Sequence, residues 1–343
     1  MEPEFPGSCR DPKPLITVAI CTRNRAPLLR EALKAVLEQR SALKLPDLVE
    51  LLVVDNDSTD STARVVEELK AFHPGIRMYR ELRHGLSFAR NAALANTSAE
   101  WVLFLDDDAV PLPGWLELYR GIAHRPPSRK LAAAGGPVLP RYEIALPKWY
   151  DPASNRLDHG KPDRKVAAIQ GPWGGNCLYL KEACLQLGSF DIALGRRPGR
   201  PAAHEDADMR MRLEETGYEI WWISGAGIQH TITNDRLTFA WECRKKLLEG
   251  KSSANLRLKA ERSPFGRLLL FARWFAIPCE VTFTLGMALV LFPFSRQRGT
   301  KAFLRSARAA GLGWGLLTGF ARVPWARRIP TPRGVAHTEP GLS

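Results

Sequence analysis

The stretch Trp101-Val-Leu-Phe-Leu-Asp-Asp-Asp108 places five apolar residues directly before three consecutive aspartates. A short apolar run bounded by polar residues is typical of a strand that is buried in a sheet. The three carboxylates would stand together where that strand ends, and they would repel one another. A divalent cation relieves such repulsion and keeps positions open for substrate phosphates. The stretch therefore predicts a Mg²⁺ or Mn²⁺ site, with a solvated acidic turn as the alternative.

Strand and helix patterns alternate along the residues before this stretch. An apolar, β-branched run predicts a strand at 15–21, a mostly apolar run predicts a second at 50–55, and residues 76–79 predict a third, short strand. Apolar residues at helical spacing predict helices at 27–39, from a cap among residues 58–60 to about residue 72, and at 87–96. The alternation predicts a Rossmann-like sheet with parallel strands and right-handed crossovers.

The carboxyl ends of these strands carry most of the candidate site residues. Parallel sheets place their ligands beyond those ends, where the turn Thr22-Arg-Asn-Arg25, the segment Asp55-Asn-Asp57 and the three aspartates fall. Asp55 can accept hydrogen bonds from a base imide or from ribose hydroxyls, and the turn offers donors to a base or a phosphate. We interpret both as nucleotide contacts; the alternative is that Asp55 only caps its own turn.

The second half of the chain has weaker patterns. Residues 120–175 are rich in Pro, Gly and basic residues, which predicts an irregular half that receives the acceptor. The Pro- and Arg-rich segment 196–201 predicts a loop. Residues 206–216 predict a helix that ends at Gly217, and 218–224 predict a strand.

Three acidic residues, Glu205, Asp206 and Asp208, stand where that helix begins. Negative charge is favourable at a helix N-terminus, so simple capping is one interpretation, although it accounts for one acid better than for three. A group transfer to a hydroxyl also needs a carboxylate that takes the acceptor proton. We therefore predict Asp206 as the catalytic base and Glu205 as its acceptor-binding neighbour.

Two further candidates flank this helix in the sequence. His230 follows the strand predicted at 218–224, and it is either a structural histidine or a ligand of the metal or of a diphosphate. The segment 171–177 sets Trp173 and Asn176 among small residues. An aromatic ring and an amide suit the face of a sugar, and a tight turn around a buried tryptophan is the alternative.

The composition is that of a folded protein with a basic tail. Of the 343 residues, 45% are hydrophobic, and the net charge is +13, which excludes a wholly disordered chain. The six cysteines form no C-x-x-C pair, and residues 1–6 show no secretory signal, so we expect reduced thiols on the cytoplasmic side. From Lys251 onward, 15 Lys and Arg stand against 3 Glu.

Apolar runs lie among these basic residues. Residues 274–294 are long enough to span a bilayer but include Pro278 and Glu280, and a weaker run follows at 309–325. Basic residues beside apolar runs favour anionic lipid over nucleic acid as the partner. We predict a hairpin that dips into the inner leaflet or helices that lie in the interface; a soluble helical subdomain is the alternative.

Motifs between Leu15 and His230 together resemble those of family 2 glycosyltransferases, which have the GT-A fold. They are Thr17-Val-Ala-Ile-Cys-Thr-Arg-Asn-Arg25, Leu51-Leu-Val-Val-Asp-Asn-Asp-Ser-Thr-Asp60, Gly85-Leu-Ser-Phe-Ala-Arg-Asn-Ala92, Phe104-Leu-Asp-Asp-Asp-Ala-Val-Pro-Leu-Pro-Gly-Trp115, Gly174-Gly-Asn176 and Glu205-Asp-Ala-Asp-Met209.

The resemblance implies an inverting transfer of a sugar from a nucleoside-diphosphate sugar, with Asp206 as the base. It implies a metal, Mg²⁺ or Mn²⁺, on Asp106 and Asp108, of which Asp108 is the safer assignment because Asp107 between them is also acidic. His230 would close the diphosphate site. The full set of predicted donor contacts is Thr22, Arg23, Asn24, Arg25, Asp55, Asp57, Gly85, Arg90, Asn91, Asp106, Asp107, Trp173, Gly175 and Asn176.

Processive relatives carry Gln-x-x-Arg-Trp after the base, whereas Leu270 holds the Gln position before Arg273-Trp274. The resemblance therefore implies a single addition to a glycan or lipid-linked acceptor, in bacterial envelope glycan or glycolipid synthesis. The protein would act at the cytoplasmic face of the inner membrane, or as a cytoplasmic peripheral protein. No nucleic acid partner is expected. Two other functions are the alternatives. A nucleotide-binding oxidoreductase would need a glycine-rich turn after the first strand, and Cys21-Thr-Arg-Asn-Arg25 contains no glycine. A non-enzymatic basic membrane adaptor would leave the acidic residues unexplained.

We therefore predict an α/β protein of GT-A type, with a Rossmann-like mixed sheet flanked by helices and a helical, apolar and basic C-terminal segment. The expected divisions are an extension at 1–14, a catalytic domain at 15–245 whose nucleotide-binding half ends at about 110 and whose acceptor half covers 111–245, a membrane-associating segment at 246–330 and a flexible tail at 331–343.

Overall fold

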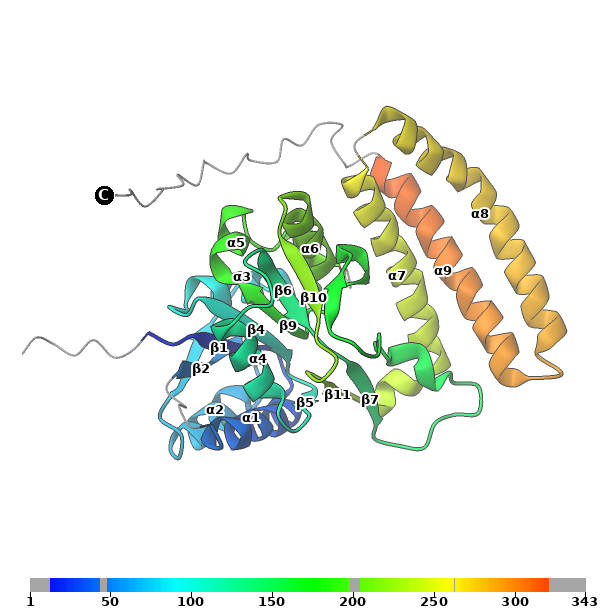
Figure 1. The fold of residues 1–343 in the computed structure, drawn as a ribbon. Coiled ribbons are helices and arrows are strands. Elements are labelled where there is room, and N and C mark those ends of the chain that lie inside the picture. Colours follow the sequence, from blue (N-terminus) through cyan, green and yellow to red (C-terminus); the bar gives the residue numbers. More distant parts are fainter. Residues whose placement is uncertain (1–12, 44–47, 198–203, 262, 321–343) are drawn as a thin grey trace, which may run out of the picture.

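The computed structural model describes residues 13–43, 48–197, 204–261 and 263–320. Its centre is an eight-stranded sheet in the order β3–β2–β1–β4–β9–β6–β10–β8, beside which lies a three-stranded sheet, β5–β11–β7 (Figure 1). Most of the loop predicted at 196–201, the tail predicted at 331–343 and nearly all of the predicted N-terminal extension lie outside the described residues.

The first half of the large sheet forms as the sequence predicts, and each strand bound agrees to within one residue. The strand β1 (Ile16–Thr22) lies parallel to β2 (Val49–Asp55) and β4 (Trp101–Asp106), and β2 lies parallel to β3 (Ile76–Arg80). One face is covered by α1 (Ala26–Ser41), α2 (Thr62–Lys70) and α4 (Trp115–His124). The other face is covered by α3 (Leu86–Ala95), α5 (Lys181–Gln186) and α6 (Glu205–Glu215).

Residues 120–175 are more regular than predicted. They contain β6 (Leu131–Gly135), β7 (Val138–Tyr142), β8 (Arg164–Val166) and short 3-10 turns at Pro152–Asn155 and Ala168–Gln170. The strand β9 (Asn176–Leu180) runs antiparallel between β4 and β6, so the sheet is mixed, and β10 (Glu219–Trp222) continues it. Three fully buried alanines, residues 132–134, form the core of β6. Alanine has a low strand preference, so tertiary packing and not local pattern creates this strand.

The small sheet brings a distant segment to the end of β4. It consists of β5 (Ala109–Pro111), β11 (Ile228–Ile232) and β7, and His230 on β11 is paired with Ala109. Because Ala109 follows Asp108, this pairing places His230 beside the three aspartates.

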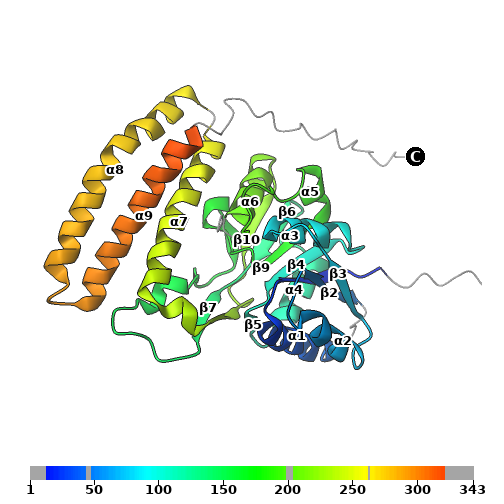
Figure 2. The same cartoon turned by 180° about the vertical axis from the view of Figure 1, so that it is seen from behind.

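Three long helices end the described chain. These are α7 (Phe239–Ala260), α8 (Pro264–Leu291) and α9 (Arg296–Phe320), preceded by a 3-10 turn at Asn234–Leu237. They form one layer beside the catalytic sheet, with α9 between α7 and α8 and with α8 outermost (Figures 1 and 2). The helix α7 continues through residues 245 and 246, where we had predicted a division.

Candidate functional site

The carboxyl ends of β1, β2 and β4 meet at one edge of the large sheet. Thr22 is paired with Asp55, and Cys21 with Asp106, so the turn at 22–25 lies between two acidic strand ends. The Thr22 hydroxyl donates a hydrogen bond of 2.7 Å to Asp107. The structure therefore brings together the three strand ends on which the predicted site depends.

The three consecutive aspartates have different surroundings. Asp107 is buried and accepts a hydrogen bond of 2.9 Å from Arg25. Asp108 is also buried, and its Oδ2 lies 2.7 Å from Arg25 and 3.1 Å from Arg236. Of the three side chains only that of Asp106 is exposed, at 46%. Arginines thus relieve the repulsion among the carboxylates, so charge repulsion alone does not require a metal, contrary to our argument from the sequence.

Asp108 and His230 contain atoms that are available to a ligand. Nε2 of His230 lies 3.1 Å from Oδ1 of Asp108, but outside hydrogen-bond geometry. Among the described residues, neither that Oδ1 nor Nδ1 of His230 has a hydrogen-bond partner. Buried polar atoms without partners are costly, so both atoms suit a bound group. Among the residues that the structure describes, no group of three His, Cys, Asp or Glu side chains could hold a metal ion by itself. A cation bound at the end of β4 would therefore also need oxygen ligands from the substrate.

Burial and nearby cations give Asp107 and Asp108 opposite properties. Burial raises the pKa of Asp107 to about 6, against the effect of Arg25. Burial acts on Asp108 in the same direction, but His230, Arg25 and Arg236 hold the pKa of that carboxyl below its ordinary value. The end of β4 is therefore surrounded by cations, which suits an anionic ligand such as a diphosphate.

Asp206 stands in the first turn of α6, close to the same strand ends. Its Oδ2 accepts hydrogen bonds from the backbone N–H of Gly174 at 2.8 Å and from Arg210 at 3.2 Å. Burial raises the pKa of this carboxyl, but Arg210, Arg90 and the Gly174 N–H together hold it below its ordinary value. Its side chain retains 18% exposure. Asp206 is thus an ionised carboxylate that is partly exposed to solvent, as a proton acceptor must be.

Glu205 is engaged differently from its neighbour. Its Oε1 accepts a hydrogen bond of 2.7 Å from Arg90, and both side chains are buried. Burial raises the pKa of Glu205, against the effect of Arg90. Arg90 also lies 3.9 Å from Asp106. Glu205 therefore anchors the arginine that connects α6 to the end of β4, and this arrangement favours a positioning role over direct contact with an acceptor.

Two glycines, Gly174 and Gly175, separate Asp206 from Asp106. A Cβ atom at Gly174 would lie 2.7 Å from both Arg90 and Asp206, and one at Gly175 would lie 2.1 Å from Oδ2 of Asp106. Only glycine allows the backbone to approach these side chains so closely. The predicted base and the exposed aspartate of β4 therefore flank the same dipeptide.

Replacing Gly175 with alanine should displace the Asp106 carboxylate and reduce enzymatic turnover at least about tenfold, because even a small shift of a reacting group is costly. We expect unfolding at a temperature close to that of wild type or a few degrees lower. Gly121→Ala on α4 is the control, since its new Cβ would meet no atom within 4 Å. Equal turnover by the two variants would show that this close approach has no functional role.

The ends of β2 and β3 continue the same edge of the sheet beyond β1. Oδ1 of Asp55 accepts a hydrogen bond of 2.9 Å from the Ser58 backbone, so the capping contact that we considered for Asp55 is present. The Asn56 side chain accepts from the Gly85 N–H at 2.7 Å and donates to two carbonyls of the loop after β3. Asp57 is bound by Arg80 at 2.7 Å and by His84 at 2.9 Å. Asn56 thus organises the loop that carries Gly85, a role that the sequence did not reveal.

Several predicted contact residues have mainly structural partners. Asn176 is fully buried, and its amide is bound to Trp115, Tyr119 and the Ala226 carbonyl, so it does not face a ligand. The Asn91 side chain forms two hydrogen bonds with the Phe190 backbone. Asn24 holds the backbone of Thr59, and Arg23 lies 3.5 Å from His84. By contrast, the Trp173 ring is 38% exposed, which contradicts the alternative of a buried tryptophan.

Comparison with known proteins shows that the residues around these strand ends match an enzyme family. Residues 17–186 match the family described as glycosyl transferase family 2. This chain belongs to that family. The succinoglycan biosynthesis protein ExoM of Rhizobium meliloti is 28% identical over 308 residues, which cover 88% of this chain and 93% of that protein. The family membership and the mixed sheet with its converging strand ends establish a nucleotide-sugar glycosyltransferase.

Two further comparisons concern a more distant relative and the fold. The glucosyl-dolichyl phosphate glucuronosyltransferase of Haloferax volcanii is 21% identical, covering 69% of this family 2 chain and 75% of that protein. The mannosyltransferase PcManGT from Pyrobaculum calidifontis, solved in complex with GDP-Man and Mn²⁺, has a TM-score of 0.54 at 20% identity, covering 90% and 75% of the two chains. At this identity the likeness concerns the fold alone, which is GT-A.

Proposed function

We propose that this family 2 glycosyltransferase moves one sugar from a nucleoside-diphosphate sugar to an acceptor hydroxyl, with inversion at the anomeric carbon. The observation that carries the proposal is the arrangement of Asp206 and Asp106 on either side of the dipeptide 174–175. Arg90 lies 3.9 Å from Asp106. The proposed base and the proposed diphosphate-binding end of the sheet would therefore act on the same bound donor.

The proposed donor contacts follow from the geometry of the strand ends. Asp55, which accepts the Ser58 N–H through Oδ1, and the loop at Gly85 would contact the nucleoside. Arg25 and Arg236 lie where a diphosphate would bring negative charge. Asn176 and Asn91 would support this pocket from behind and would not contact the donor.

The proposed chemistry is a single displacement. Asp206 would take the proton of the acceptor hydroxyl while that oxygen bonds to the anomeric carbon and the bond to the nucleoside diphosphate breaks. The transition state would resemble the oxocarbenium-like state of glycoside hydrolysis. Glu205 would hold Arg90 in place beside Asp106. One displacement of this kind inverts the anomeric configuration.

We further propose that a divalent cation, Mg²⁺ or Mn²⁺, binds at the end of β4, with Asp106, Asp108 and His230 as its candidate protein ligands. Because no three such side chains form a cage in the described part of the chain, phosphate oxygens of the donor would complete its coordination. The hard oxygen donors and the unpartnered atoms of Asp108 and His230 fit such an ion. When bound, the ion would stabilise the negative charge that develops on the leaving diphosphate.

A panel of nucleoside-diphosphate sugars tests the proposed reaction. We expect one or a few donors to release their nucleoside diphosphate, and proton NMR of the product to show the opposite anomeric configuration from the donor. Retention of configuration would contradict the role of Asp206, and the absence of release from every donor would contradict the proposed function itself.

Removing divalent ions tests the metal assignment. Exhaustive chelation should reduce donor turnover at least about a hundredfold, since a cation on the leaving group contributes several kcal/mol to the reaction. Addition of Mn²⁺ or Mg²⁺ in excess of the chelator should restore it. Turnover that withstands chelation, in a sample shown to be metal-free by elemental analysis, would refute the metal.

The acceptor and location are proposed from the relatives and the helical layer. ExoM is named for succinoglycan biosynthesis, and the Haloferax relative for a dolichyl phosphate substrate. We propose a glycan or lipid-linked acceptor in envelope synthesis, a single addition, and a location at the cytoplasmic face of a membrane. The catalytic domain would end near residue 238, where α7 begins, and the helices α7 to α9 would form a separate membrane-associating unit.

A further inference from the structure

The helix α8 has an apolar surface that no other part of the described chain covers. It is long and apolar enough to cross a membrane by length and composition alone, with a mean hydropathy of 1.7, and only 11% of its most apolar window is buried. Side chains that face α9 recur at helical spacing and include Trp274, Ile277 and Val281. The opposite side, which we call the outer face, consists of Leu268, Ala272, Phe275, Cys279, Phe283 and Val290, all exposed.

This outer face is unusual because it carries no charge. Phe275, Phe283 and Val290 are each 61–69% exposed. No charged residue occurs between Val281 and Ser295, and the pair Arg273 and Glu280 shares one flank of the helix. A contiguous exposed apolar surface of this kind marks an interface with a partner or a membrane.

The packing of the three helices favours an arrangement in which α8 does not span the membrane. Because α9 packs against both α7 and α8, a spanning α8 would draw both neighbours into the bilayer. Yet α9 is tied to the catalytic domain near its beginning, where Lys301 binds Asp151 at 3.1 Å and Gln297 donates to the Tyr150 carbonyl. The helix α7 carries charged pairs such as Lys246 and Glu249. Charged side chains within a bilayer are costly, so these helices must remain outside it.

Cations line the groove between α8 and α9. This groove has a volume of about 220 Å³; on one side lie Met287 and Leu291 of α8, together with Phe283, which borders both the groove and the outer face. On the other side lie Arg298, Lys301 and Arg305 of α9. Arg298 and Arg305 have no carboxylate partner among the described residues. Apolar side chains next to cations match the chemistry of an anionic lipid, whose phosphate adjoins its acyl chains.

We propose that α8 lies flat in the surface of a bilayer that contains anionic lipid. The outer face enters the acyl boundary, and Arg298 and Arg305 contact lipid phosphates. The helix is about 42 Å long, at 1.5 Å per residue, so it provides an extended contact parallel to the membrane. This inference deepens the proposed membrane location, and it commits the surface to lipid and not to a second copy of the chain.

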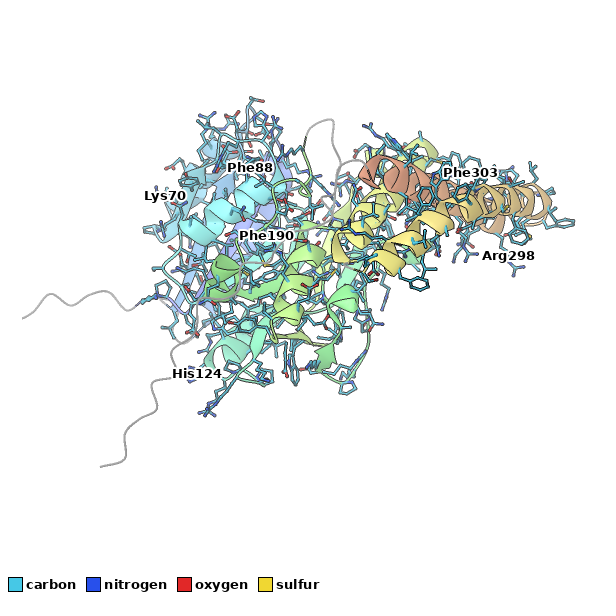
Figure 3. The ribbon with its side chains drawn as sticks, turned by 90° about the horizontal axis from the view of Figure 1, so that it is seen from above. Lys70, Phe88, His124, Phe190, Arg298 and Phe303 are labelled. Atoms are coloured by element: carbon cyan, nitrogen blue, oxygen red, sulfur yellow. The ribbon has the colours of Figure 1, made fainter. Side chains whose placement is uncertain are left out.

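Binding to vesicles tests the role of the cations. The full chain should bind mixed phosphatidylcholine–phosphatidylglycerol vesicles more tightly than pure phosphatidylcholine vesicles, and added salt should weaken that preference. The double variant Arg298→Gln/Arg305→Gln should bind the mixed vesicles about 25-fold more weakly, at about fivefold for each cation. The matched control is Arg64→Gln/Lys70→Gln on α2, because Lys70 and Arg298 stand at opposite ends of the molecule (Figure 3).

Substitutions on the outer face test the apolar contribution. Phe283→Ser and Val290→Ser should each weaken binding to the mixed vesicles about tenfold, with unchanged thermal unfolding because both side chains are exposed in the folded protein. A stable dimer in the absence of lipid that either substitution dissociates would assign the face to a second copy. Equal binding by wild type and by all these variants would also overturn the proposal.

Cysteine labelling distinguishes a flat helix from a spanning one. Ser263→Cys and Ser295→Cys mark the two ends of α8, each in a background with Cys279→Ser, and their labelling is scored relative to the Cys279→Ser protein, which retains the other native cysteines. In inverted membrane vesicles from expressing cells, an impermeant maleimide should reach both ends, and in right-side-out vesicles it should reach neither. Labelling of the two ends from opposite sides would refute the flat arrangement.

A measurement of donor hydrolysis separates this inference from the proposed reaction. The Arg298→Gln/Arg305→Gln variant should hydrolyse the donor in lipid-free solution at the wild-type rate. Failure of this inference is therefore distinguishable from failure of the proposed reaction.

Discussion

Asp206→Asn should lower the rate of sugar transfer about 10²- to 10⁴-fold, the range that a general base typically contributes. Asparagine retains the shape of the side chain and can still accept the hydrogen bond from the Gly174 backbone, but it cannot accept the proton. The affinity for the donor should change little, because Asp206 acts on the acceptor. The measurement is single-turnover transfer at saturating donor, together with donor binding.

The same helix provides a matched control for this substitution. Asp208 also lies in the first turn of α6, two residues after Asp206. It is paired at 2.9 Å with Arg212, four residues later, just as Asp206 is paired with Arg210. Asp208→Asn should therefore lower the unfolding temperature while leaving the rate of transfer nearly intact. If Asp206→Asn retained wild-type transfer, or if both variants lost it equally, Asp206 would not be the base.

Asp106→Asn should reduce donor turnover at least about a hundredfold without loss of stability, since this side chain is exposed and only distantly paired with Arg90. Asp108→Asn should also reduce turnover, but with a large loss of stability. The second substitution leaves Arg25, Arg236 and His230 around a neutral group, and breaking a buried charge cluster typically costs about 3–5 kcal/mol.

Urea unfolding and turnover, measured on the same samples, separate the two effects. The control is Asp158→Asn, a carboxylate 28% exposed and paired with Arg156 at 2.7 Å in a loop outside the cleft. A stable Asp106→Asn enzyme with unchanged metal-dependent turnover would remove Asp106 from the metal site. A fully stable Asp108→Asn protein would show that the surrounding arginines do not depend on that carboxylate.

The sequence predicted the first half of the fold well because strand and helix signals there are local. The runs at 51–54 and 101–105 are continuous and apolar, and an amphipathic helix follows each of them later in the chain. The strand β6 had no such signal, because its central residues are alanines that become a strand only between β9 and β10. Residues 120–175 were therefore predicted to be more irregular than they are.

The candidate site could be located from the sequence, but its charge balance could not. Strand order fixes where Thr22, Asp55 and Asp106 meet, and a parallel sheet makes this foreseeable. The partners of the acids come from far along the chain: Arg236 reaches Asp108 from beyond β11, and Arg90 reaches Glu205 from α3. No spacing rule connects such residues, so Arg236 was not predicted, and Arg90 was predicted as a donor contact and not as the partner of Glu205.

Calorimetric titration of the nucleoside diphosphate of the preferred donor, with and without Mn²⁺, tests most directly whether these strand ends form a metal-assisted diphosphate site. Wild type should bind the nucleotide much more tightly with Mn²⁺ than without it, and Asp106→Asn should lose that difference. Equal affinity under both conditions, or an Asp106→Asn protein that responds to Mn²⁺ as wild type does, would contradict the account.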